Sequence, residues 1–240
     1  MNFKTFLLYS ILVITSCTIS DNSGTFKSSP TIFSVIKTGD LGCNVIIDST
    51  IDISASAPES TLFIFDAEVF LNNSPAVIVN VEDESLGYNY VYRIDTYIEG
   101  EKEYLLTAII GKDTFFTKTT TPKNIEFRYI ADSIVLNLDT MTFLMWNRSG
   151  IDFYFLQFYE HTDSGLVSSF GMGVENDTIA MLFPFSLFFT DSAVYDVSIM
   201  AMDSNYMQLL MGAGSSFGEN TYGFFSSVSV DILQNIQIVK

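Results

Sequence analysis

Residues 103–123 read EYLLTAIIGKDTFFTKTTTPK and carry the clearest fold signal in the chain. Two runs of β-forming residues, Glu103–Ile110 and Asp113–Thr119, flank the turn Gly111-Lys112-Asp113. Such runs around a short glycine-containing turn predict a β-hairpin. The second run leads to Pro122, which cannot continue a central strand because it lacks a backbone N–H. We therefore place a domain boundary at this proline.

Similar short runs, rich in Val, Ile, Thr, Phe and Tyr, occur throughout the chain between clusters of Gly, Pro, Asn, Asp and Ser. This spacing predicts an all-β protein rather than helices or βαβ units. Only Asn205–Leu210 has helical character. The other expected strands are Thr31–Lys37, Cys43–Ile53, Ala67–Leu71, Ala76–Val81, Tyr88–Thr96, Ile134–Leu138, Met141–Trp146, Asp152–Glu160, Thr178–Phe183, Ala193–Met202 and Val228–Val239.

Three aromatic residues indicate the kind of sandwich. Tyr104 and Tyr195 each follow a polar turn and begin an alternating strand, as the corner tyrosine of immunoglobulin-like sandwiches does. Trp146, the only Trp, suits the core tryptophan of a fibronectin-III-like sandwich. We expect two consecutive immunoglobulin- or fibronectin-III-like β-sandwiches, an N-terminal one at 30–122 and a C-terminal one at 123–240, after a lipoprotein signal peptide.

The start of the chain has the features of an export signal. Lys4 precedes the apolar run Phe6–Thr15, and the small residue Ser16 precedes Cys17. A positive start, an apolar stretch of about 7–15 residues and a small residue before the cut make up a secretory signal peptide. The run is too short to span a bilayer, which takes about 20 residues. An ordinary signal peptide with a nearby Cys is one interpretation.

The other interpretation is lipidation, because Ile14-Thr15-Ser16-Cys17 resembles a bacterial lipobox. The resemblance implies that residues 1–16 are removed, that Cys17 carries acyl chains such as palmitate, and that residues 17–29 form a tether. Two or more acyl chains give stable anchoring. Thr18 rather than Asp follows the Cys, which by analogy with lipoprotein sorting favours the outer membrane, on its periplasmic or surface face.

Composition excludes some functions and bounds others. The chain has 28 acidic and 11 basic residues, a net charge of −17. Such a surface repels nucleic acid, since binding phosphates needs Lys and Arg. Aromatic residues reach 15%, which excludes an acidic disordered tail and provides for a large core. If Cys17 is acylated, Cys43 has no disulfide partner; it is then a reactive thiol or, as we expect, a small buried hydrophobe.

No catalytic constellation stands out, and we expect a protein that is not an enzyme, with no cofactor. His161 is the only His, in what we expect to be an exposed hairpin end, so multi-histidine metal sites are excluded. Carboxylates are numerous, so their number alone does not exclude the paired-carboxylate site of a glycosidase, but nothing in the sequence singles out one pair. Two oxygen-rich clusters, Glu82-Asp83-Glu84 and Asp203 with Asn205, have the ligand type that calcium prefers, but solvated loops are the simpler interpretation and we assign no metal site.

Aromatic rings in or near loops are the more promising binding chemistry. They occur in Asn89-Tyr90-Val91-Tyr92, at Tyr206 and in Tyr222-Gly223-Phe224-Phe225. Such rings stack on sugars or anchor a partner protein, since tyrosine serves interfaces well. The alternative is that they belong to the core, which we favour for Phe224 and Phe225. We therefore take Tyr206 and Tyr222 as the candidate binding residues.

The C-terminal part resembles a family of uncharacterised lipoproteins of Bacteroidetes-type outer membranes, with two β-sandwich domains and genes often near those of TonB-dependent receptors. The resemblance is carried by Tyr195-Asp-Val-Ser-Ile, Ala201–Tyr206 and Asn220–Ser227, and more loosely by Phe65–Val69 and Thr119–Pro122. The family more often has two glycines where this chain has Thr221-Tyr222.

The resemblance implies no catalytic residues. It implies a non-enzymatic binding or accessory component of an outer-membrane uptake or surface complex, with a TonB-dependent barrel as a partner. A structural or adhesion lipoprotein of the envelope, without a small-molecule ligand, is the alternative.

Overall fold

The structure is a computed structural model that describes residues 28–51, 62–81, 90–128, 135–151, 153–175, 178–212, 215–217 and 221–240. Helical structure in these residues is limited to the 3-10 helix η3 (Phe183–Phe188) and the α-helix α2 (Ser204–Leu210). The strands are β1 (Pro30–Lys37), β2 (Cys43–Ser49), β3 (Glu68–Leu71), β4 (Ser74–Pro75), β5 (Val77–Asn80), β6 (Tyr90–Ile94), β7 (Glu103–Ile110), β8 (Asp113–Thr120), β9 (Val135–Asn137), β10 (Phe143–Met145), β11 (Phe153–Thr162), β12 (Gly165–Glu175), β13 (Ile179–Met181), β14 (Val194–Met202) and β15 (Tyr222–Val239).

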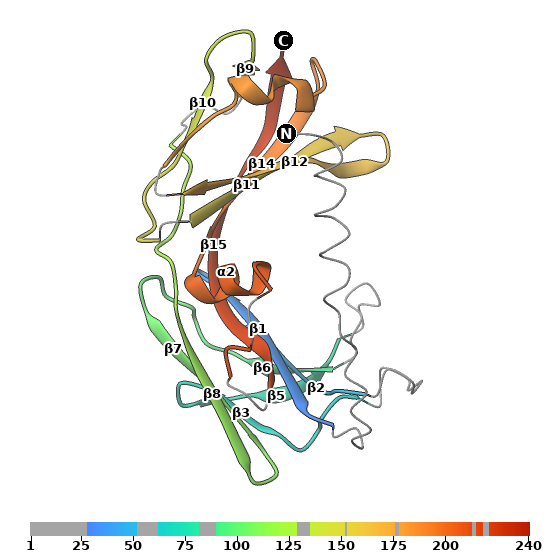
Figure 1. Cartoon of the computed structure of the whole chain (residues 1–240), viewed down its shortest axis with the longest axis vertical. Coiled ribbons are helices and arrows are strands. Elements are labelled where there is room, and N and C mark those ends of the chain that lie inside the picture. Colours follow the sequence, from blue (N-terminus) through green and yellow to red (C-terminus); the bar gives the residue numbers. More distant parts are fainter. Residues whose placement is uncertain are drawn as a thin grey trace, which may run out of the picture.

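One sheet runs through both halves of the elongated molecule. Its order is β12-β11-β14-β15-β1-β2-β6-β5, with β9 also paired to β15. The 18-residue strand β15 makes this possible, because its first part pairs with β1 in the N-terminal half and the rest pairs with β14 in the C-terminal half (Figure 1). Two smaller sheets, β4-β3-β7-β8 and β10-β13, cover the N-terminal and C-terminal parts of this long sheet.

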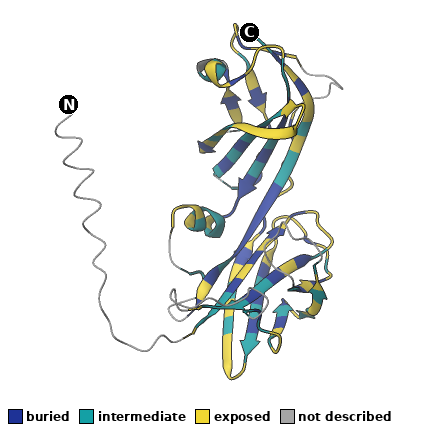
Figure 2. Cartoon of the chain, turned by 90° about the vertical axis from the view of Figure 1, so that its right-hand side faces the viewer, coloured by how far each residue is buried: buried dark blue, intermediate teal, exposed yellow. Residues whose placement is uncertain are grey.

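Each half has its own hydrophobic core. The N-terminal cluster contains Ile32, Val45 and Leu106, and the C-terminal cluster contains Trp146, Tyr154 and Val197. Buried positions alternate with exposed ones along many strands, as expected of strands with one face in a core (Figure 2). The chain is thus all-β and forms two β-sandwiches, as the sequence predicted.

The division at residues 30–122 and 123–240 needs one correction. Tyr222 to Val228 pair in parallel with Thr31 to Lys37, and Phe225 is fully buried in the N-terminal core. Gly223 permits this pairing because it lies at a φ of 136° and any Cβ there would come 1.8 Å from the carbonyl oxygen of Ile32. The end of the chain therefore completes the first sandwich. We had expected the last strand to begin only at Val228.

The corner tyrosines are present. The hydroxyl oxygen of Tyr104 accepts from the N–H of Glu99 at 2.8 Å, and that of Tyr195 accepts from the N–H of Thr190 at 2.8 Å. Tyr154 makes a third bond of this spacing to the N–H of Ser149 at 3.2 Å, which the sequence reasoning missed. Trp146 is fully buried beside Tyr154, and the hairpin β7–β8 forms as predicted.

Strand β12 is absent from the strands expected from the sequence, although a hairpin end was expected at His161. Its sequence GLVSSFGMGVE is rich in Gly and Ser, which are poor strand formers. The neighbouring strand compensates for the missing side chains: a Cβ at Gly171 would lie 2.8 Å from the ring of Phe155, and one at Gly173 would lie 3.0 Å from the ring of Phe153. Aromatic rings of β11 therefore cover these glycines, and cross-strand packing overrides local propensity.

Candidate functional site

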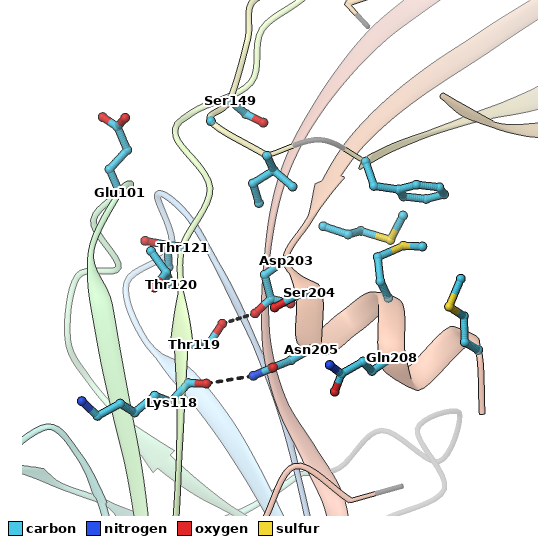
Figure 3. A pocket seen from close by; sticks show the side chains of 16 residues that line it. Glu101, Lys118, Thr119, Thr120, Thr121, Ser149, Asp203, Ser204, Asn205 and Gln208 are labelled. Carbon is cyan, nitrogen blue, oxygen red and sulfur yellow. Dashed lines mark hydrogen bonds between the residues drawn. The ribbon is translucent and has the colours of Figure 1, made fainter. Parts of the chain in front are cut away.

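A groove of about 810 Å³ lies where the two sandwiches meet (Figure 3). One wall is the end of β8, from Lys118 to Thr120, with the following Thr121, and the other is α2. The segment Ser149–Ile151, with Phe153, closes one end. Residues of both halves therefore line the groove.

Asp203 fixes the start of α2 at the base of this groove. Its Oδ1 accepts from the N–H of Tyr206 at 2.8 Å, as an N-cap residue does, and its Oδ2 contacts the hydroxyl of Thr119 on the opposite wall. The Thr119 hydroxyl also lies 2.8 Å from that of Ser227, which donates to the carbonyl of Thr120 at 3.0 Å. A buried polar network therefore joins α2, β8 and β15.

The Asp203 carboxylate is buried, and it accepts from the Thr119 hydroxyl and from the N–H of Tyr206. Burial raises the pKa of Asp203 above its ordinary value, against the hydrogen bonds that lower it.

Asn205 closes the free edge of β8. Its side-chain amide donates at 2.8 Å to the carbonyl of Lys118 and at 2.8 Å to the carbonyl of Phe225. Strand β8 is an edge strand of its sheet, and an exposed edge invites pairing with other chains. Asn205 and Ser227 thus occupy two edge carbonyls, which fixes the position of this wall relative to α2.

The two walls differ in chemistry. Met207 and Met211 at α2, together with Ile151 and Phe153 at the end of the groove, provide apolar surface. The other wall presents Glu101, Lys118 and the exposed Thr120. Lys118 is neutralised by Glu103, since Nζ lies 2.7 Å from Oε1. The groove therefore suits a ligand with an apolar and a polar side.

The predicted binding residues do not come together here. Tyr206 lies on α2, half-buried, and does not line the groove. Tyr222 is 63% exposed on β15 and pairs with Thr31, outside the groove. Of the neighbouring rings, Phe225 is in the core as expected, whereas Phe224 is only half-buried and packs against Phe33 with ring centroids 6.5 Å apart.

The sequence reasoning missed the groove because its lining comes from distant segments. Met207 was visible in Asn205–Leu210, but nothing in the local pattern pairs it with Thr119–Thr121 or Phe153.

His161 is the second-last residue of the long strand β11 and is exposed, as predicted, but its side chain has a partner. Its Nε2 lies 2.9 Å from Oδ1 of Asp196, which also accepts from the N–H of Asn235 at 3.0 Å. Asp196 lies at a register shift between β14 and β15, so the pair supports an irregular part of the sheet. The described contacts of His161 include no serine or cysteine that it would activate.

Other sequence hypotheses concern metal, thiol and membrane. In the described ranges, no group of three His, Cys, Asp or Glu side chains is placed to hold a metal ion, while Glu82-Asp83-Glu84 lies outside them. Cys43 is buried as expected, and burial raises its pKa to about 12.

Cys17 and residues 1–27 lie outside the described residues. The described part contains no helix long and apolar enough to cross a membrane.

Comparison with known proteins gives weak structural likenesses only. No family model matches the sequence, and no curated protein matches it. Fibronectin(III)-like modules of CbhA from Clostridium thermocellum are similar at a TM-score of 0.27 and 11% identity, over 88% of this chain and 94% of theirs. The IG1+IG2 domains of DIP-gamma are similar at a TM-score of 0.23 and 6% identity, over 88% of this chain and 98% of theirs.

Proposed function

We propose that the protein is a membrane-anchored, non-enzymatic lipoprotein that acts as a binding or accessory component of an outer-membrane uptake or surface complex. The observation that carries this proposal is the groove between the sandwiches, whose volume of about 810 Å³ lies within the range of ligand sites. Methionine is a flexible, polarizable side chain that is common at adaptable binding surfaces. Met207 and Met211 suit the recognition of an extended, amphipathic segment of a partner protein.

A pull-down tests the proposal. The lipidated protein would be isolated from its native outer membrane in mild detergent, and copurifying chains identified by mass spectrometry. Met211→Glu places a charge on the apolar wall at a side chain that is 77% exposed, and Met141→Glu makes the same change at a methionine that is 71% exposed outside the groove.

We expect a TonB-dependent barrel or another envelope protein in stoichiometric amount, lost with Met211→Glu and retained with Met141→Glu. Equal recovery of the partner with both variants would show that the groove does not bind it. No stoichiometric partner at all would contradict the accessory role itself.

The anchor has its own test. Cys17→Ser removes the acceptor thiol, so the variant should leave the membrane fraction for the soluble one. If the variant remained attached after carbonate and high-salt washing, the lipid anchor would be refuted.

A structural or adhesion role is the second candidate, and strand β12 favours it. This strand ends the long sheet and has no charged residue from Gly165 to Val174. Natural edge strands are usually protected by lysine, proline or inward-pointing charge. Self-association in ultracentrifugation that Ser168→Lys abolishes, without any copurifying barrel, would support this role instead.

A further inference from the structure

An apolar stripe crosses the outer face of the N-terminal part of the long sheet. On β1, Ile32 and Ile36 are buried in the core, so Phe33 and Val35 face the other way, and they are 40% and 46% exposed. Phe33 lies opposite Phe224 on one side and opposite Ile46 on the other. The face that has no second sheet on it is therefore apolar on three neighbouring strands.

The stripe ends at β2. Val45 pairs with Tyr92, so the next residues, Ile46 and Val91, lie side by side, but Val91 is only 1% exposed. Three strands thus contribute one solvent-accessible apolar residue each, in the order Phe224, Phe33, Ile46. We call this row the outer stripe. No local sequence pattern shows it, because its members come from residues 33 to 224.

The rows on either side carry both apolar and polar side chains. Val35, 46% exposed, flanks the stripe on one side, and the exposed Asn44 and Arg93 follow it in the same row. The Arg93 Nε lies 2.9 Å from Oδ1 of the exposed Asp95, so this cation is neutralised. Tyr222, 63% exposed, flanks the other side together with Thr31 and Asp48.

The outer stripe is too small for a stable protein interface. Three strands about 4.8 Å apart and three rows about 7 Å apart cover about 300 Å². Stable interfaces bury about 800 Å² on each partner. The outer stripe therefore suits an occupant that is flat, apolar and held nearby by another attachment.

The position of the stripe relative to the start of the described chain identifies that occupant. Phe33 lies five residues after Ser28, where the described chain begins, and residues 18–27 separate Ser28 from Cys17. A chain of this length spans at most about 35 Å, whatever its conformation. A short tether gives an effective concentration in the millimolar range, so a contact that is weak alone becomes occupied.

We propose that the outer stripe rests on the lipid bilayer to which the protein is tethered, with Phe33, Tyr222 and Val35 in the interfacial region. This proposal rests on the lipid anchor of the proposed function. Aromatic side chains favour the membrane interface, where one end of the ring is apolar and the other is wet. Because β8 belongs to the opposite sheet of this sandwich, the contact leaves the groove facing away from the membrane, toward a partner.

The test uses a tether that does not depend on natural lipidation. The mature chain, with Cys17→Ser and an N-terminal histidine tag, is attached to phosphatidylcholine vesicles that contain a nickel-chelating lipid. Val35→Cys takes a polarity-sensitive dye, while the native Cys43, 6% exposed, stays unlabelled. Phe116→Cys on β8, where the side chain is 64% exposed, takes the same dye as the matched control.

Quenching by lipids with brominated acyl chains is the measurement. We expect quenching at position 35 about threefold or more above that at position 116, reduced to the control level by Phe33→Glu and unchanged by a charge at position 116 on the opposite sheet. Equal quenching at both positions would overturn the proposal. A dye response that follows protein concentration rather than lipid would overturn it in favour of a second copy of the chain. Since the tag replaces the acyl group, these outcomes are independent of the Cys17→Ser fractionation that tests the anchor.

Discussion

Phe225→Ala tests whether the end of the chain stabilises the first sandwich. The side chain is fully buried among N-terminal residues such as Ile32, although it lies on the last strand. Truncation of a buried phenylalanine costs about 3–5 kcal/mol, which is a large part of the 5–15 kcal/mol that stabilises a typical domain. We expect the free energy of unfolding to fall by this amount, with the effect concentrated in the N-terminal half.

The matched control is Ile236→Ala on the same strand. Ile236 is 1% exposed and belongs to the C-terminal core, and its truncation costs about 2–5 kcal/mol. Native-state hydrogen exchange with mass spectrometry gives the local free energy of opening. Phe225→Ala should raise exchange in Cys43–Ser49 and Glu103–Ile110, whereas Ile236→Ala should raise it in Phe153–Thr162 and Val194–Met202.

The reasoning would be refuted by one pattern in particular. If Phe225→Ala left exchange in Cys43–Ser49 and Glu103–Ile110 unchanged while raising it in the C-terminal strands, β15 would not be shared between the cores. A loss below about 1 kcal/mol would equally contradict the burial of this ring.

Other substitutions test single features. Gly223→Ala should destabilise the β1–β15 pair by several kcal/mol because its Cβ meets the Ile32 carbonyl at 1.8 Å, and unchanged chemical denaturation would argue against this close approach. Asp203→Asn keeps the N-cap and supplies an N–H to Thr119. Because burial raises the pKa of Asp203, its contribution to stability is fully present below the ordinary pKa of an aspartate and is lost as pH rises through the folded-state pKa. The wild type should therefore lose stability relative to Asp203→Asn between acid and neutral pH, whereas parallel pH–stability curves would contradict the raised pKa. Tyr104→Phe leaves the Glu99 N–H without its hydroxyl partner and should cost about 1–3 kcal/mol in urea unfolding, against no change if water replaces the hydroxyl. Cys43, with its pKa raised to about 12, should react with thiol reagents at pH 8 only after unfolding, and fast labelling of the native protein would show that it is accessible.

Part of the candidate site could be predicted and part could not. The helical segment Asn205–Leu210 and the hairpin that ends in Thr119–Thr121 are both local patterns, and both form. Their juxtaposition depends on Asp203 reaching Thr119 across 84 residues of sequence. Tyr222 was expected to bind because it is aromatic and near a loop; its side chain is exposed, but its strand partner Thr31 comes from the first strand.

The sequence by itself determined the all-β class, most strand positions and the corner tyrosines, because alternation and turn chemistry act over a few residues. It could not determine that β12 is a strand, since its glycines are supported by the rings of Phe153 and Phe155 on the neighbouring strand. Nor could it show that Tyr222 to Val228 pair with β1, because nearly 200 residues separate the partners and no local preference selects a parallel pairing. Only the tertiary structure decided which core receives Phe225, where the groove opens and which apolar residues form the outer stripe, since these depend on register between strands that are distant in sequence.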